Sequence, residues 1–247
     1  MFSALYGVAA RKSIKLDDFT MGIVGVGHVG SLVEKMARYL GFKVLLCDPP
    51  RAAAEGDEKF CSLEYLLENS QIVTLHVPLD ETTRKMADAN FFAMMPTGSI
   101  FINASRGEVV DEEALMLTLP KFGAVVIDTW NNEPDVNEEL VEMVDIATPH
   151  IAGYSYQGKL NGTAASVQAV ARHFGIEPLY DFYPQEQGDE DRSPVLLALK
   201  GKTQGEVAAV FQYNYPIYTD DFRFRMEPHN FEKMRSNYQY RREIYVE

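Results

Sequence analysis

A glycine-rich loop lies between an apolar run and an amphipathic segment early in the chain, and this context limits the possible folds more than any other feature. The apolar run covers residues 21–24, and apolar side chains recur at helical spacing over residues 32–40. Gly25 permits a tight turn, Gly27 lets the backbone approach a pyrophosphate, and Gly30 allows close packing of helix on strand. The helix N-terminus would then offer free N–H groups to phosphates. We therefore expect a dinucleotide-binding unit here, with His28 and Val29 completing the loop.

An acidic residue stands where such a unit would meet the ribose of its nucleotide. Asp48 follows the apolar segment 42–47 and lies eighteen residues after Gly30. A carboxylate there accepts a hydrogen bond from a ribose 2′-OH and repels a 2′-phosphate, which predicts NAD rather than NADP. Two alternatives stay open. Asp48 also begins an Asp-Pro-Pro turn, and Arg51 is close enough in sequence to hold a 2′-phosphate.

The same alternation of strand and helix continues along the chain. Short runs that are apolar throughout alternate with segments of helical periodicity, as in a parallel sheet covered on both faces. The apolar fraction of 46% is enough for such a core. We therefore predict an α/β fold with a Rossmann-like, doubly wound parallel sheet. The expected strands are 21–25, 42–47, 72–76, 99–103, 124–128 and 145–148, and the expected helices are 2–10, 32–40, 62–69 and 111–119.

Charge and cysteine content argue against several classes of function. The net charge of −13 repels nucleic acid and anionic membranes, so we expect neither as a partner. The chain has no run of about 18 apolar residues and no signal peptide, which predicts a cytoplasmic protein without a membrane span. Cys47 and Cys61 have no metal-ligand spacing, so we expect no metal site and a reducing compartment.

Three further residues each follow the end of an expected strand, and together they indicate a reaction. They are Arg106, Glu133 and His150. The carboxyl ends of parallel strands meet at one edge of a sheet, where open α/β sheets bind ligands. Arg106 presents a planar fork to a carboxylate, His150 titrates near neutral pH and can act as a base, and Glu133 can orient and stabilise the imidazolium. With a nicotinamide to accept the hydride, they predict oxidation of a small 2-hydroxy acid.

Taken singly, none of the three residues is specific. An arginine after a strand is usually a surface residue, a glutamate before proline usually lies in a loop, and a histidine after Thr-Pro is usually structural. Their common placement at strand ends favours a catalytic role. His76 also follows a strand end, and we expect it to form a wall of the nucleotide site.

At these residues the chain resembles the D-isomer-specific 2-hydroxyacid dehydrogenase family, over about residues 16–174. The resemblance implies that Arg106, Glu133 and His150 are catalytic and that Asp128 faces the nicotinamide amide. It also implies cofactor contacts at Val77, Pro78, Ala104, Ser105, Arg106 and Gly153. The shared motifs are the glycine loop, His-x-Pro-Leu at 76–79, Asn-x-Ser-Arg-Gly at 103–107, Val-Val-Asp-x-x-Ala-Leu at 109–115, Asp-x5-Pro at 128–134 and Thr-Pro-His at 148–150.

Residues 46–51 and 148–159 are similar to one branch of this family, whose substrate is a small phosphorylated 2-hydroxy acid. In that branch Tyr154, together with Arg106, would bind the substrate. The tail of the chain also resembles this branch, where the C-terminal segment is an α+β dimerisation domain. It holds ten aromatic residues between 211 and 245, and aromatic residues are enriched in interface cores. We therefore expect a homodimer formed through this segment.

Family members carry most of a substrate domain before the nucleotide-binding domain. We therefore expect this chain to begin in the helix that joins the two domains, with the residues for the substrate phosphate missing. The expected division is a remnant of that helix at 1–15, an NAD-binding domain at 16–150, a return helix at 151–175 and the dimerisation domain at 176–247, with a linker or exposed loop at 180–194. The alternatives are another D-2-hydroxyacid dehydrogenase, or a noncatalytic NAD-binding regulator or remnant on the same scaffold.

Overall fold

The fold was analysed in a computed structural model that describes residues 1–184 and 192–246. These residues form two compact units. The first comprises Met1–His150 and Leu199–Ser236, and the second comprises the described residues within Ile151–Ala198 and Asn237–Glu247. The expected dimerisation segment is thus divided between the two units. Of the linker expected at 180–194, residues 185–191 lie outside the described part of the chain.

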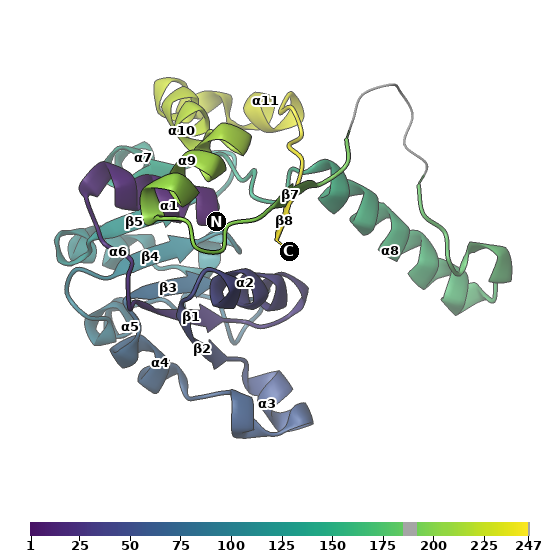
Figure 1. The fold of residues 1–247 in the computed structure, drawn as a ribbon, viewed down its shortest axis with the longest axis horizontal. Coiled ribbons are helices and arrows are strands. Elements are labelled where there is room, and N and C mark those ends of the chain that lie inside the picture. Colours follow the sequence, from purple (N-terminus) through teal and green to yellow (C-terminus); the bar gives the residue numbers. More distant parts are fainter. Residues whose placement is uncertain (185–191, 247) are drawn as a thin grey trace. The chain divides into compact units, whose positions relative to one another are not determined.

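The first unit is built on six strands: β1 (Thr20–Val24), β2 (Lys43–Cys47), β3 (Ile72–Leu75), β4 (Ile100–Asn103), β5 (Ala124–Ile127) and β6 (Ile146–Ala147). They form one sheet in the order β2-β1-β3-β4-β5-β6, and every neighbouring pair is parallel (Figure 1). The chain reverses its direction of travel across the sheet between β1 and β3. Open sheets bind ligands at such a switch point, beyond the carboxyl ends of the strands. The predicted doubly wound parallel sheet is confirmed.

Helices pack against this sheet in two groups. The helices α4 (Leu63–Asn69), α5 (Ala89–Met94), α6 (Glu112–Thr118) and α7 (Glu138–Met143) contact one another in sequence order. They share a buried core with Val73, Phe101 and Val125 of the central strands. The second group includes α1 (Phe2–Lys12), which contacts β5 and α9 (Gln204–Asn214), and α2 (His28–Tyr39), which contacts β1 and β2.

Capping residues explain where several helices begin. The Asp111 side chain accepts a hydrogen bond from the backbone N–H of Ala114 at 3.2 Å, as expected for the N-cap of α6. Asp48 was expected to begin a turn, but it caps a further helix, α3 (Pro49–Glu55). Proline is tolerated in the first helical turn, where its missing N–H has no intrahelical partner to lose.

The segment Leu199–Ser236 is an integral part of the first unit. It contains α9, α10 (Ile217–Met226) and α11 (Phe231–Ser236). The carboxylate of Asp221 accepts hydrogen bonds from the Ala147 N–H at 2.7 Å and from the Arg225 guanidinium at 2.9 Å. Arg225 donates in turn to the carbonyl oxygens of Val141 and Val144 at the end of α7. These buried polar contacts hold α10 against the edge strand β6.

The second unit contains one long helix and a small sheet. Helix α8 (Tyr156–Phe174) begins at Ser155, whose hydroxyl accepts from the Gly158 N–H at 2.9 Å and donates to Glu243 at 2.7 Å. It ends at Gly175, which adopts the left-handed conformation. Strands β7 (Val195–Leu197) and β8 (Ile244–Val246) form a parallel pair.

Candidate active site

The glycine loop between β1 and α2 has the geometry of a phosphate cradle. Gly25 has φ +84°, and a Cβ on Gly30 would lie 2.1 Å from the carbonyl oxygen of Gly25. Only glycine fits these two positions. Gly27 is the N-cap of α2, has no side-chain cap and has open space where its Cβ would be. The first N–H groups of α2, beginning at His28, are thus available to a phosphate.

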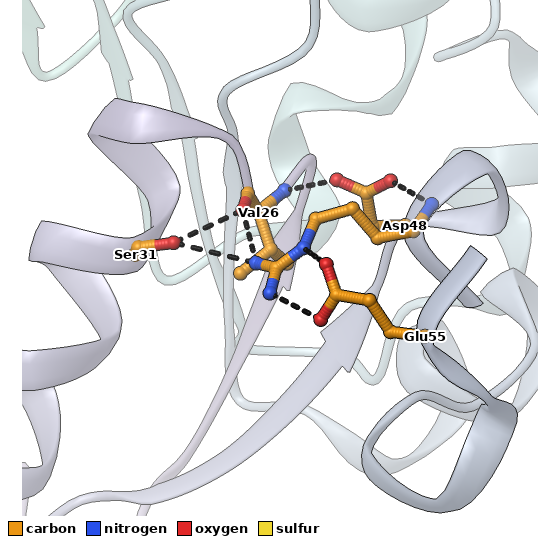
Figure 2. A network of polar contacts seen from close by, with 5 residues as sticks. Val26, Ser31, Asp48 and Glu55 are labelled. Atoms are coloured by element: carbon orange, nitrogen blue, oxygen red, sulfur yellow. Dashed lines mark hydrogen bonds and ion pairs between the residues drawn. The ribbon is translucent and has the colours of Figure 1, made fainter.

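Asp48 at the end of β2 binds the backbone of this loop. One carboxylate oxygen accepts from the Val26 N–H at 2.7 Å, and the other accepts from the Arg51 N–H at 3.0 Å (Figure 2). A carboxylate has about four acceptor sites, so these two bonds leave capacity for a ribose hydroxyl. The carboxylate that caps α3 therefore also orders the glycine loop, and the ribose contact stays a prediction.

Arg106 extends from a loop that Asn103 shapes. The side chain of Asn103, fully buried at the end of β4, accepts from the N–H and hydroxyl of Ser105 and donates to the Arg106 carbonyl oxygen at 2.9 Å. The Arg106 side chain is exposed, and its guanidinium donates to the Ser105 carbonyl oxygen at 2.7 Å. A planar, exposed cation is thus presented from a loop that the Asn103 side chain orders.

Glu133 and His150 are brought together by two loops at the ends of β5 and β6. The Nδ1 atom of His150 lies 2.8 Å from Oε2 of Glu133. The other carboxylate oxygen accepts from the Trp130 N–H at 2.9 Å, which fixes the orientation of Glu133. His150 has φ +54°, an uncommon conformation for a non-glycine residue, and its N–H donates to the Asp128 carbonyl oxygen. Strain of this kind is typical of functional positions.

Further residues that the sequence predicts at the nucleotide site follow the ends of β3 and β5. A Cβ on Gly25 would meet the His76 carbonyl at 2.7 Å and the Val77 side chain at 2.8 Å, so these two residues lie beside the glycine loop. Burial lowers the pKa of His76 to about 4, and its Nε2 lies 3.0 Å from the Thr74 hydroxyl. His76 is therefore neutral near pH 7. Asp128 is buried, and its carboxylate accepts from the Thr148 hydroxyl at 2.7 Å.

Gly153 and Tyr154 belong to the second unit. Open space surrounds the position of a Gly153 Cβ. The Tyr154 ring makes edge contacts with Tyr238 and Tyr240, with centroid distances of 5.9 and 5.8 Å. The Lys159 ammonium lies 3.9 Å from the centroid of the Tyr154 ring. A cation–π contact of this length orients the ring.

The structure adds two site residues that the sequence analysis missed, Gly107 and Glu112. A Cβ on Gly107 would lie 2.0 Å from the Trp130 carbonyl, so the Arg106 loop and the Glu133 loop are packed directly against each other. The Glu112 carboxylate accepts from the Asn131 N–H at 2.8 Å, and burial raises its pKa. Gly107 follows the arginine of the Ser-Arg-Gly motif, and this position in the motif was a signal from which a role at the site could have been predicted. Glu112 had no sequence signal, because its partner is 19 residues away.

Among residues 1–184 and 192–246, no group of three or more His, Cys, Asp or Glu side chains is placed to hold a metal ion. No helix among these residues has the length and apolar character to cross a membrane.

Sequence comparisons connect this site to known proteins. A family profile described as "D-isomer specific 2-hydroxyacid dehydrogenase, NAD binding domain" matches residues 7–152. Erythronate-4-phosphate dehydrogenases of Yersinia pestis and Yersinia pseudotuberculosis are 39% identical over 257 aligned residues, which cover 98% of this chain and 67% of each relative. The chain therefore spans about two thirds of their length. Because the profile is that of an NAD-binding domain and the glycine loop fits a pyrophosphate, the cofactor is NAD.

Solved structures share the fold. D-Lactate dehydrogenase from Aquifex aeolicus, solved with NAD and lactic acid, superposes with a TM-score of 0.58 and 26% identity over 76% of this chain and 68% of the enzyme. Glyoxylate reductase from "Paecilomyes thermophila" has a TM-score of 0.53 and 26% identity over 63% of this chain. The match covers about half of that reductase, 52%.

Proposed function

Because the chain belongs to the D-isomer-specific 2-hydroxyacid dehydrogenase family, we propose that it oxidises 4-phospho-D-erythronate to 2-oxo-3-hydroxy-4-phosphobutanoate with NAD. The observation that carries this proposal is the Glu133–His150 pair, with 2.8 Å between carboxylate and imidazole, in a chain 39% identical to erythronate-4-phosphate dehydrogenases. The reaction would serve the synthesis of pyridoxal 5′-phosphate. Another D-2-hydroxyacid as substrate is the first alternative.

In the proposed mechanism His150 is the base. A neutral imidazole that donates from Nδ1 to Glu133 leaves Nε2 as an acceptor for the hydroxyl proton of the substrate. Glu133 keeps the ring in that tautomer and stabilises the imidazolium that forms. Bound NAD would supply the acceptor for the hydride that leaves C2. The products are the 2-oxo acid, NADH and a proton on His150.

The other residues bind and orient in this proposal. Arg106 holds the substrate carboxylate and polarises the C2 oxygen as charge develops there. Tyr154 contacts the substrate, and Asp128 faces the nicotinamide amide. Asp48 accepts the ribose 2′-OH and disfavours NADP. The proposed cofactor contacts are Gly25, Gly27, His28, Val29, Gly30, Asp48, Val77, Pro78, Ala104, Ser105, Arg106, Asp128 and Gly153.

Turnover with different acids tests the function. NADH formation is followed with 4-phospho-D-erythronate, D-lactate and D-glycerate at equal concentration. Because the chain spans two thirds of its Yersinia relatives, the assay includes a chimera that adds the N-terminal segment of one relative. We expect the chimera to prefer the phosphorylated acid. Faster turnover of an unphosphorylated acid would favour another D-2-hydroxyacid dehydrogenase, and NAD binding without any turnover would favour a noncatalytic regulator or remnant.

We also propose that the partner is a second copy of this chain, bound through residues after about 176. Three of the ten aromatic residues in the tail, Phe211, Phe224 and Phe231, are buried within the first unit and are not available. Tyr213 and Phe222 are 88% and 64% exposed, which favours an interface role for them. Location in the cytoplasm is proposed because Cys47 and Cys61 are both free thiols.

Light scattering tests the dimer. We expect the unaltered chain to be dimeric, and Tyr213→Glu with Phe222→Glu to shift it toward monomer because charges would enter an apolar contact. A truncation after residue 175 is not a fair test, since it removes Leu199–Ser236 from the first unit. Leu117→Glu, on a side chain that is 84% exposed and outside the tail, is the matched control and should leave the dimer intact. A monomeric unaltered chain would contradict the proposal.

A further inference from the structure

The Arg51 guanidinium is engaged by Val26, Ser31 and Glu55, the three partners labelled in Figure 2 besides Asp48. Its Nε and Nη2 atoms donate to the two carboxylate oxygens of Glu55 at 2.6 and 2.7 Å. Its Nη1 atom donates to the Val26 carbonyl oxygen at 2.6 Å and reaches the Ser31 hydroxyl at 3.4 Å. The edge of the guanidinium formed by Nε and Nη2, which could bind an anion through two parallel hydrogen bonds, is therefore directed to Glu55.

This occupation bears on the choice between NAD and NADP. In dinucleotide-binding units, an arginine near the acidic residue that ends the second strand can hold the 2′-phosphate of NADP. Arg51 is in that place, since its own N–H donates to the carboxylate of Asp48. A phosphate and a carboxylate use the same fork of a guanidinium, so Glu55 and a 2′-phosphate would compete for Arg51.

Ion pairs also neutralise positive charges that line the pocket beside Arg51. It has a volume of about 480 Å³, and Arg38, Arg51 and Lys59 are among its lining residues. Arg38 pairs with Glu34 at 2.9 Å, as Arg51 pairs with Glu55, in each case across one helical turn. Without the two glutamates, this pocket would be a cationic site next to the ribose position.

We propose that Glu55 is a second determinant of selection for NAD over NADP, and that it acts by occupying Arg51. This rests on the proposed ribose contact of Asp48 and deepens it. Asp48 repels the 2′-phosphate of NADP. Glu55 binds the Arg51 guanidinium, which would otherwise attract that phosphate. A role in stability alone would be small, because exposed pairs of this kind contribute little to folding, and the Arg51 and Glu55 side chains are 34% and 44% exposed.

Calorimetric titration of the unaltered chain and of Glu55→Ala with NAD and with NADP tests the proposal. We expect the ratio of the NADP dissociation constant to the NAD dissociation constant to fall about tenfold in Glu55→Ala, the size expected for one charge-assisted contact. Adding Arg51→Gln to Glu55→Ala should remove this gain, because the released guanidinium is the source of the new affinity. Thermal unfolding of each variant checks that the fold is retained.

Glu58→Ala is the matched control. Glu58 lines the same pocket and carries the same charge, but no hydrogen bond or ion pair joins it to Arg51 among the described residues. Its removal should change the ratio less than about twofold. An unchanged ratio in Glu55→Ala, or an equal change in Glu58→Ala, would overturn the proposal. If the unaltered chain binds NADP as well as NAD, the preference assigned to Asp48 fails, and the change caused by Glu55→Ala still decides the role of Glu55.

Discussion

Replacement of His150 by alanine should lower kcat for oxidation of the 2-hydroxy acid about 10²–10⁴-fold, the usual contribution of a positioned base. The alanine variant leaves the hydroxyl proton without an acceptor, while the glycine loop and Asp48 are untouched. Initial rates of NADH formation in the chimera measure the loss, and NAD titration shows whether the cofactor site is retained. Full activity in His150→Ala would remove the proposed mechanism.

Glu133→Gln separates the orienting role from the base itself. A neutral amide stabilises the imidazolium that forms during proton transfer less than a carboxylate does, so kcat should fall while NAD binding is retained. Initial rates of NADH formation and NAD titration in the chimera measure the two effects. Arg106→Lys should also lose most activity, since an ammonium lacks the two-pronged geometry.

Replacement of Gly107 by alanine should destabilise the protein by about 2–3 kcal/mol and lower kcat about 10²-fold. The new methyl group would lie 2.0 Å from the carbonyl of Trp130 and 2.5 Å from the Asn131 nitrogen. These are backbone atoms, so the loop itself must move. That movement would carry Glu133 away from His150, because the Trp130 N–H holds the Glu133 carboxylate. Urea unfolding and initial rates measure the two effects.

Gly162→Ala is the control for this substitution. Gly162 lies inside α8, and open space surrounds the position of its Cβ. Alanine is favoured over glycine in a helix interior by about 1 kcal/mol, so this variant should be as stable as the unaltered chain or slightly more stable. If Gly107→Ala unfolds at the same urea concentration as the unaltered chain, the close packing of the two loops is not a constraint.

The local pattern of the sequence was sufficient to predict the parallel sheet and the contact between Glu133 and His150. Apolar runs that alternate with helices can satisfy their backbone groups and bury their side chains in few ways, and a parallel sheet is the main one. Once the strands are parallel, their carboxyl ends meet at one edge. Residues 17 positions apart in sequence, such as Glu133 and His150, are then brought within hydrogen-bonding distance.

Tertiary structure alone decided the features that depend on contacts between distant segments. The aromatic tail was expected to form a separate dimerisation domain, yet Asp221 binds Ala147 across 74 residues and α10 belongs to the first unit. Arg51 and Glu55 pair across one turn of helix α3. The sequence analysis expected only a turn at this place, so it did not predict the pair. The sequence by itself determined the order in which the candidate site residues follow the strands. The glycine loop follows β1, Asp48 follows β2, and Arg106, Glu133 and His150 follow β4, β5 and β6. Long-range packing decides which side chains bind each other and which backbone segments are in contact. Local periodicity in the sequence does not encode this packing.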